Sequence, residues 1–158
     1  MNKVLKKLEQ FGIVPVVVLE DAKDAVLLAK ALCDGGLACA EVTFRTAAAE
    51  ESIRIMSQEF PEMVVGAGTV LTVEQVDRAV KAGAQFIVSP GFNPVVVKYC
   101  IDHEIPITPG VVTPSEMEQA IAMGLEVVKF FPAEPSGGLA MIKTVVDMLD
   151  GAKYLWQK

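Results

Sequence analysis

One lysine, Lys129, lies in the otherwise apolar segment Val127-Val128-Lys129-Phe130-Phe131-Pro132. Burial among valine and phenylalanine side chains disfavours the ammonium form and lowers the pKa of a lysine toward the free amine, which is its nucleophilic form. A neutral amine in an apolar pocket is what Schiff-base chemistry on a keto acid requires. The alternative is that Lys129 lies at the end of a strand and extends its charged head into water along an apolar stem.

A carboxylate, Glu41, lies in an earlier apolar run. Residues two apart on a strand share a face, so Glu41, Thr43 and Arg45 lie together, as do Lys129 and Phe131. If these faces point into one space, Glu41 can move protons beside Lys129, and Arg45 offers a planar fork to a substrate carboxylate. The alternatives are a structural Glu41–Arg45 ion pair and an arginine that only lies at the surface.

The elements that must position these residues recur along the chain. Short runs of mostly apolar, β-branched residues lie around positions 14, 39, 64, 86, 107 and 127, and an amphipathic helical stretch follows each. Capping residues at Thr72, Asn93 and Thr113 predict where three of the helices begin, and a further helix is predicted over 138–149. Alternating strands and helices predict a parallel sheet covered by helices, either an open doubly wound sheet or a barrel.

Polar residues decide between these two folds. They follow several successive strands, at 41–45, 66–69, 89–90, 108–110 and 129, and the segment 66–69 is predicted to form a tight turn. Functional groups from many strand ends are typical of a (β/α)8 barrel, whereas a doubly wound sheet uses one crevice. We therefore predict a single α/β domain over 1–158 of the TIM-barrel type, incomplete, with about six βα units and the last strands missing.

Composition excludes several classes of partner. A net charge of -6 and a pI near 4.8 argue against nucleic acid. Three cysteines without metal-type spacing and a single histidine predict neither a metal site nor a disulfide framework, and they fit a reducing cytoplasm. The longest apolar run, 13–19, is too short to span a bilayer, so no membrane partner is predicted.

Four segments resemble the class I, Schiff-base family of 2-keto-3-deoxy-6-phosphogluconate and 4-hydroxy-2-oxoglutarate aldolases. They are EVTFRT at 41–46, GAGTVLT at 66–72, AGAQFIVSPGF at 82–92 and VVKFFPAE at 127–134. The resemblance covers essentially the whole chain. It implies a carbon-carbon lyase that acts on a small 2-keto acid without a metal or other cofactor, and that typically forms a homotrimer.

The same resemblance implies a role for six residues. Lys129 would be the Schiff-base lysine and Glu41 the acid-base residue. Arg45 and Thr69 would bind the carboxylate of the pyruvyl group. Pro90 and Phe131 would form walls around the reacting carbons. No residue is implied to hold a metal.

The chain is short for such a barrel, which takes about 250 residues against 158 here. We expect it to stop before the seventh and eighth strands, and so to lack the family's phosphate-binding loops, a Thr-Gly-Gly turn and a Gly-Ser segment. On this expectation the isolated chain has marginal stability and cleaves the phosphorylated substrate poorly, because binding energy from a phosphate normally helps to position the reacting centre.

Three hypotheses follow. The first is an aldolase that forms an imine between Lys129 and a 2-keto acid and releases pyruvate and an aldehyde. The second is a non-catalytic remnant that serves as an assembly or interaction subunit. The third is a different barrel enzyme, such as an isomerase that binds a sugar phosphate and would not need Lys129 in an apolar strand. Trapping with pyruvate and borohydride separates the first two.

Overall fold

The structure is a computed structural model that describes residues 2–148 and 153–156. The strands are β1 (Val16–Val17), β2 (Cys39–Thr43), β3 (Val64–Gly68), β4 (Ile87–Ser89), β5 (Ile107–Val111), β6 (Val127–Phe130) and β7 (Lys153–Trp156). The helices are α1 (Lys3–Phe11), α2 (Asp24–Asp34), α3 (Ala49–Glu59), α4 (Val73–Ala82), α5 (Pro94–Asp102), α6 (Pro114–Ala122) and α7 (Gly138–Met148), with a 3-10 helix η1 (Glu134–Ser136) before α7.

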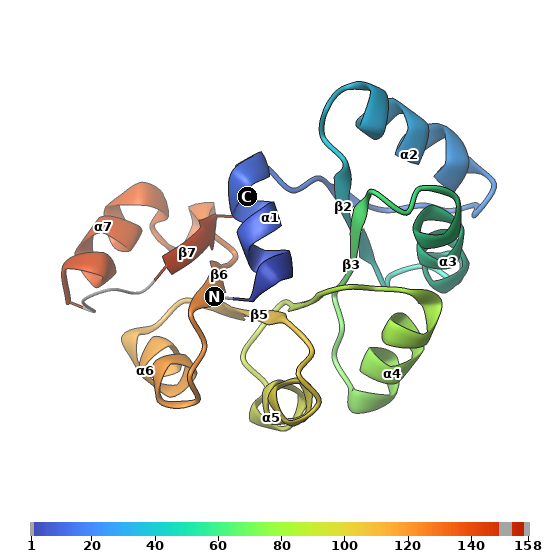
Figure 1. The fold of residues 1–158 in the computed structure, drawn as a ribbon. Coiled ribbons are helices and arrows are strands. Elements are labelled where there is room, and N and C mark those ends of the chain that lie inside the picture. The colour runs from blue at the N-terminus through green and yellow to red at the C-terminus, as the bar shows by residue number, and fades with distance from the viewer. Residues whose placement is uncertain (1, 149–152, 157–158) are drawn as a thin grey trace.

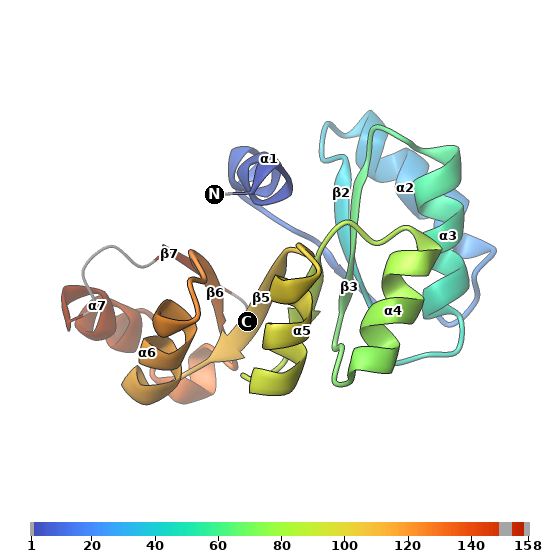
Figure 2. The same ribbon diagram turned by 60° about the horizontal axis from the view of Figure 1, so that its bottom comes forward.

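The strands form one parallel sheet in the order in which they occur along the chain. Figure 1 shows this sheet as an arc, with α2 to α6 along its outer side and α1 on the inner side. In the turned view of Figure 2, α3, α4 and α5 follow one another outside the sheet, and neighbouring helices of this series contact each other. The arrangement is an incomplete barrel of the (β/α)8 type, as predicted.

The sheet has one strand more than the six that were predicted. Lys153–Trp156 pairs with β6 in parallel, from Val127 opposite Lys153 to Phe130 opposite Trp156. From the sequence, the run Tyr154-Leu155-Trp156 indicates at most the beginning of a seventh strand, and the pairing with β6 shows that the strand forms. Leu149, the last residue of the helix predicted over 138–149, lies outside the described residues.

Side chains at the helix starts form the predicted caps. Thr72 accepts a hydrogen bond from the backbone N–H of Gln75. At α6, Thr113 and Glu116 form a complete capping box, which satisfies two backbone donors that a helix start would otherwise leave unpaired. These caps fix where α4 and α6 begin, and therefore how the preceding strands β3 and β5 end.

Apolar side chains pack on both sides of the sheet. The outer side is covered by two clusters, one centred on α2 to α5 and one on α6 that includes Val128 and Phe130. On the inner side, Leu8 of α1 packs with Cys39, Val64 and Phe86. The helix α1 therefore closes the amino-terminal end of the barrel interior. No helix of the described residues is long and apolar enough to cross a membrane.

The segment predicted as a tight turn after the third strand is largely strand. Gly66 and Gly68 belong to β3 and pair with Glu41 and Thr43 of β2. Both glycines make room on the inner face, because an added Cβ would lie 2.3 Å from the Phe86 ring at Gly66 and 2.1 Å from Oε1 of Glu41 at Gly68. Only Thr69 continues into the turn, with a left-handed φ of 57°.

Candidate active site

Strand register brings Lys129 and Glu41 to the same face of the sheet. Partners in register point to the same side of a parallel sheet, and residues two apart on a strand do too. Glu41 pairs with Gly66 of β3, and Lys129 pairs with Gly110 of β5. The side chains next to Lys129 in sequence, Val128 and Phe130, pack in the outer cluster. Lys129 and Glu41 therefore both point into the barrel interior.

The two charged groups meet there. Nζ of Lys129 lies 3.8 Å from Oε1 of Glu41, and the side chains are only 6% and 1% exposed. Burial is the main cause that lowers the pKa of Lys129 below its ordinary value, the Glu41 carboxylate opposes this effect, and the Arg45 guanidinium adds to it. The amine is thus held away from water, beside a carboxylate that can exchange protons with it.

Gly68 makes the position of the Glu41 carboxylate possible. Any side chain at Gly68 would overlap Oε1, Cδ and Cγ of Glu41. Thr43, two residues after Glu41, is also buried and donates a hydrogen bond from Oγ1 to the carbonyl of Val17 at 3.2 Å. That bond ties the end of β2 to β1 and fixes the strand from which Glu41 projects.

Arg45 and Thr69 form a second polar pair, on the loops that follow β2 and β3. Nε of Arg45 donates a hydrogen bond to Oγ1 of Thr69 at 3.3 Å. Thr69 is β-branched and adopts a left-handed backbone conformation that such residues rarely take. Arg45 is exposed and acts on the pKa of Lys129, so its guanidinium lies within electrostatic range of the buried amine.

Phe131 and Pro90 border the same space. Nζ of Lys129 lies 4.5 Å from the centroid of the Phe131 ring, within the range of a cation–π contact. The carbonyl of Pro90 occupies the position that a side chain at Gly110 would take, since a Cβ there would lie 2.1 Å from that oxygen. Because Gly110 is the register partner of Lys129, the loop after β4 passes directly beside the lysine.

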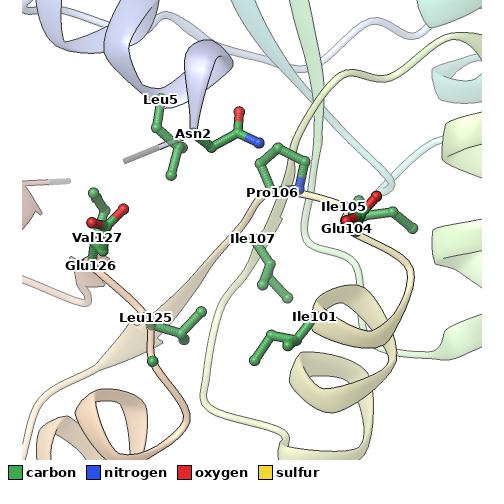
Figure 3. Close-up of a pocket in the computed structure, with 11 residues that line it drawn as sticks. Asn2, Leu5, Ile101, Glu104, Ile105, Pro106, Ile107, Leu125, Glu126 and Val127 are labelled. Carbon is green, nitrogen blue, oxygen red and sulfur yellow. The ribbon is translucent and has the colours of Figure 1, made fainter.

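A hollow of about 200 Å³ lies at the amino-terminal ends of β5 and β6. Figure 3 shows that Asn2, the N-cap of α1, and Leu5 of α1 face the segments that lead into β5 and β6 across this hollow. Glu104 and Glu126 contribute its charged groups, and the described lining has no basic side chain. An anionic keto acid would be repelled from such a lining, so this hollow does not compete with the Lys129 site.

The six residues singled out from the sequence are therefore grouped around one end of the barrel. Lys129 contacts both Glu41 and Phe131, and Arg45 donates a hydrogen bond to Thr69. The sequence did not indicate that Gly68 makes room for the Glu41 side chain, because a contact between β2 and β3 depends on the register of these strands. No cluster of three or more potential metal ligands occurs in the part of the chain that the structure describes.

The fold and this site together define an α/β-barrel protein with a buried lysine beside a carboxylate inside the barrel. The sequence matches the model of the KDPG and KHG aldolase family over residues 4–154. The chain belongs to this family.

Individual relatives are similar over most of the chain. A 2-dehydro-3-deoxy-phosphogluconate aldolase of Treponema pallidum is 52% identical over 155 residues, which are 98% of this chain and 74% of the relative. The structure of the 2-keto-3-deoxy-6-phosphogluconate aldolase of Zymomonas mobilis with 3-phosphoglycerate has a TM-score of 0.94 at 37% identity, over 99% of this chain and 75% of that chain. A KDPG aldolase of Legionella pneumophila, in which pyruvate was captured as a covalent carbinolamine intermediate, has a TM-score of 0.88 at 38% identity, over 91% and 70%.

Proposed function

We propose that this protein is a carbon-carbon lyase that cleaves a 2-keto acid through an imine on Lys129. The proposal rests on the contact between the Lys129 amine and the Glu41 carboxylate, which are both buried and lie 3.8 Å apart. Burial favours the nucleophilic amine, and the carboxylate supplies the proton transfers that imine formation needs. The substrate class follows the family: 2-dehydro-3-deoxy-phosphogluconate or 4-hydroxy-2-oxoglutarate, cleaved to pyruvate and an aldehyde.

The proposed reaction uses the same two groups in each step. Lys129 and Glu41 share one proton, which Glu41 holds when the amine is free. The Lys129 amine adds to the keto carbon, a proton passes from nitrogen to oxygen to give a carbinolamine, and Glu41 protonates its hydroxyl, which leaves as water as the protonated imine forms. Glu41 then accepts the proton of the substrate hydroxyl, the aldol bond breaks, and its electron pair passes to the imine to give an enamine. Protonation of the enamine carbon and hydrolysis of the imine release pyruvate and restore the free amine.

The remaining site residues would bind and shape the substrate. Arg45 presents a guanidinium beside the Thr69 hydroxyl, a pair of donors suited to the carboxylate of the pyruvyl group. The Phe131 ring and the Pro90 segment would exclude water from the reacting carbons.

Pyruvate and borohydride test the imine directly. Reduction should fix one pyruvyl group on the protein, and peptide mapping should place it on Lys129. Lys129→Met should abolish labelling. Lys98→Met is the matched control, because Lys98 is an exposed lysine of α5 that pairs with Asp102, and this variant should label like the parent. An unlabelled parent protein would refute the lysine mechanism and favour the non-catalytic subunit instead.

The finer expectations are the trimer and the cytoplasmic location. The trimer follows the family resemblance. The location follows the cysteines, because Cys33, Cys39 and Cys100 are free thiols, which fits a reducing compartment. Light scattering coupled to size exclusion measures the mass of the assembly, and a monomer across the accessible concentration range would contradict the trimer.

A further inference from the structure

One buried hydroxyl in the barrel interior has no internal partner. Thr108 of β5 is 3% exposed, and within the described part of the chain its Oγ1 makes no hydrogen bond. The other buried hydroxyls behave differently: Thr43, Ser52 and Ser89 each donate to a backbone carbonyl, at 3.2, 2.7 and 2.8 Å. Since a buried unpaired hydroxyl costs free energy that a valine of the same shape would not, Thr108 calls for a reason beyond packing.

Register places Thr108 on the face that carries the candidate site. Thr108 pairs with Val88 of β4, whose side chain packs in the inner cluster behind α1. Thr108 also stands two residues before Gly110, the register partner of Lys129. Residues two apart point to the same side, so the Thr108 hydroxyl and the Lys129 amine share the barrel interior.

The distance between Thr108 and Lys129 suits one small molecule bound between their side chains. Two residues along a strand span about 6.6 Å and neighbouring strands lie about 4.8 Å apart, which puts the Cα atoms of Thr108 and Lys129 about 8 Å from each other. Gly110 adds no side chain between them, and Val88 offers no polar group. The hydroxyl therefore lies beneath the amine, at the floor of the site, with a donor and an acceptor for an oxygen atom.

We infer that Thr108 is a positioning residue that binds the water molecule exchanged at the Lys129 imine. The inference rests on the proposed function. As the carbinolamine loses its hydroxyl, the nitrogen lone pair forms the carbon-nitrogen double bond, and the departing oxygen takes a proton from Glu41 and becomes water on Thr108. In hydrolysis a water molecule held at the same hydroxyl, after exchange with solvent, adds to the imine carbon and returns a proton to Glu41.

The test measures oxygen exchange between pyruvate and heavy-oxygen-labelled water. Thr108→Val keeps the shape and removes the hydroxyl. The rate of oxygen exchange should fall by roughly threefold to tenfold, which corresponds to the loss of one neutral hydrogen bond. The pyruvate concentration that gives half-maximal exchange should stay unchanged, because Thr108 does not bind the carboxylate. Thr108→Ser keeps the hydroxyl and should restore exchange. The melting temperature of Thr108→Val should equal or exceed that of the parent, because an unpaired buried hydroxyl has been removed.

The outcomes separate this inference from the proposed function. If the parent exchanges oxygen and Thr108→Val exchanges at the same rate, the role of Thr108 is wrong and the imine mechanism stands. A loss in Thr108→Val that Thr108→Ser does not restore, or a lower melting temperature in Thr108→Val, would show a packing role and also overturn the inference. If the parent forms no imine with pyruvate, the proposed function fails and the inference fails with it.

Discussion

Gly68→Ala tests whether the position of the Glu41 carboxylate limits the reaction. The variant adds one methyl group on β3 and substitutes none of the residues proposed to react. Its Cβ would lie 2.1 Å from Oε1 of Glu41 and 2.7 Å from both Cδ and Cγ. Glu41 is only 1% exposed, so the carboxylate cannot evade the contact by turning out into solvent.

The size of the effect follows from this overlap. Non-bonded heavy atoms settle about 3.5 Å apart, so the carboxylate has to move by about 1.4 Å from its place beside Lys129. A misplacement of about 1 Å in a reacting group lowers a rate by roughly a hundredfold. Overpacking of this kind also costs ~1–3 kcal/mol of unfolding free energy. We therefore expect slow imine formation in a protein that is less stable but still folded.

The assay is the initial rate of borohydride trapping with saturating pyruvate, per folded molecule, beside urea unfolding of the same samples. Gly91→Ala is the neutral control, since no atom lies within 4 Å of its added Cβ. Gly66→Ala is the packing control, because its Cβ would meet the Phe86 ring at 2.3 Å and not Glu41. Gly66→Ala should lose stability with a smaller loss of trapping rate. If folded Gly68→Ala traps pyruvate within a few-fold of the parent, the seating of Glu41 by Gly68 is not limiting.

Three further variants probe charge and strain. Glu41→Gln should slow trapping by about 10²–10⁴-fold through loss of proton transfer. The carboxylate opposes the lowering of the Lys129 pKa by burial, so its removal should lower that pKa further. The rise of the trapping rate with pH should therefore move to lower pH. Arg45→Gln should move that rise to higher pH, because the Arg45 charge adds to the lowering of the Lys129 pKa by burial. It should also weaken pyruvate binding by roughly tenfold or more through loss of a charge-assisted hydrogen bond. An unchanged pH profile in Glu41→Gln or Arg45→Gln would contradict the expected effect of that residue on the pKa of Lys129. Thr69→Asn should raise the unfolding free energy in urea by ~1 kcal/mol, because asparagine tolerates a φ of 57° better than threonine does; equal or lower stability would contradict strain at Thr69.

The parts of the fold that depend on local chemistry could be predicted from the sequence. Caps at Thr72, Asn93 and Thr113 involve residues only two or three positions apart, and they form as expected. Alternation along the strands grouped Glu41 with Thr43 and Arg45, and Lys129 with Phe131. That these two faces meet in the barrel interior depended on the register between strands.

Features that depend on register between strands could not be predicted. The contact of Gly68 with Glu41 and the pairing of Thr108 with Val88 need the offset between neighbouring strands, which no local pattern specifies. The segment 66–69 was predicted as a turn because glycines favour turns, whereas 66–68 belong to β3 and the two glycines provide space on its inner face. The left-handed backbone of Thr69 had no signal in its residue type, since threonine rarely adopts it.

Alternation along β6 also connects Lys129 to the packing on the outer side of the sheet. Val128 and Phe130 hold the backbone on either side of Lys129, and both are anchored in a cluster with Met117 of α6. The lysine backbone cannot shift without opening that cluster. A substitution at Met117 would therefore alter the position of Lys129 through Val128 and Phe130, without contact to any of the groups proposed to react. Efforts to tune the reactivity of this enzyme family while keeping its substrate contacts have a natural starting point on the outer helices.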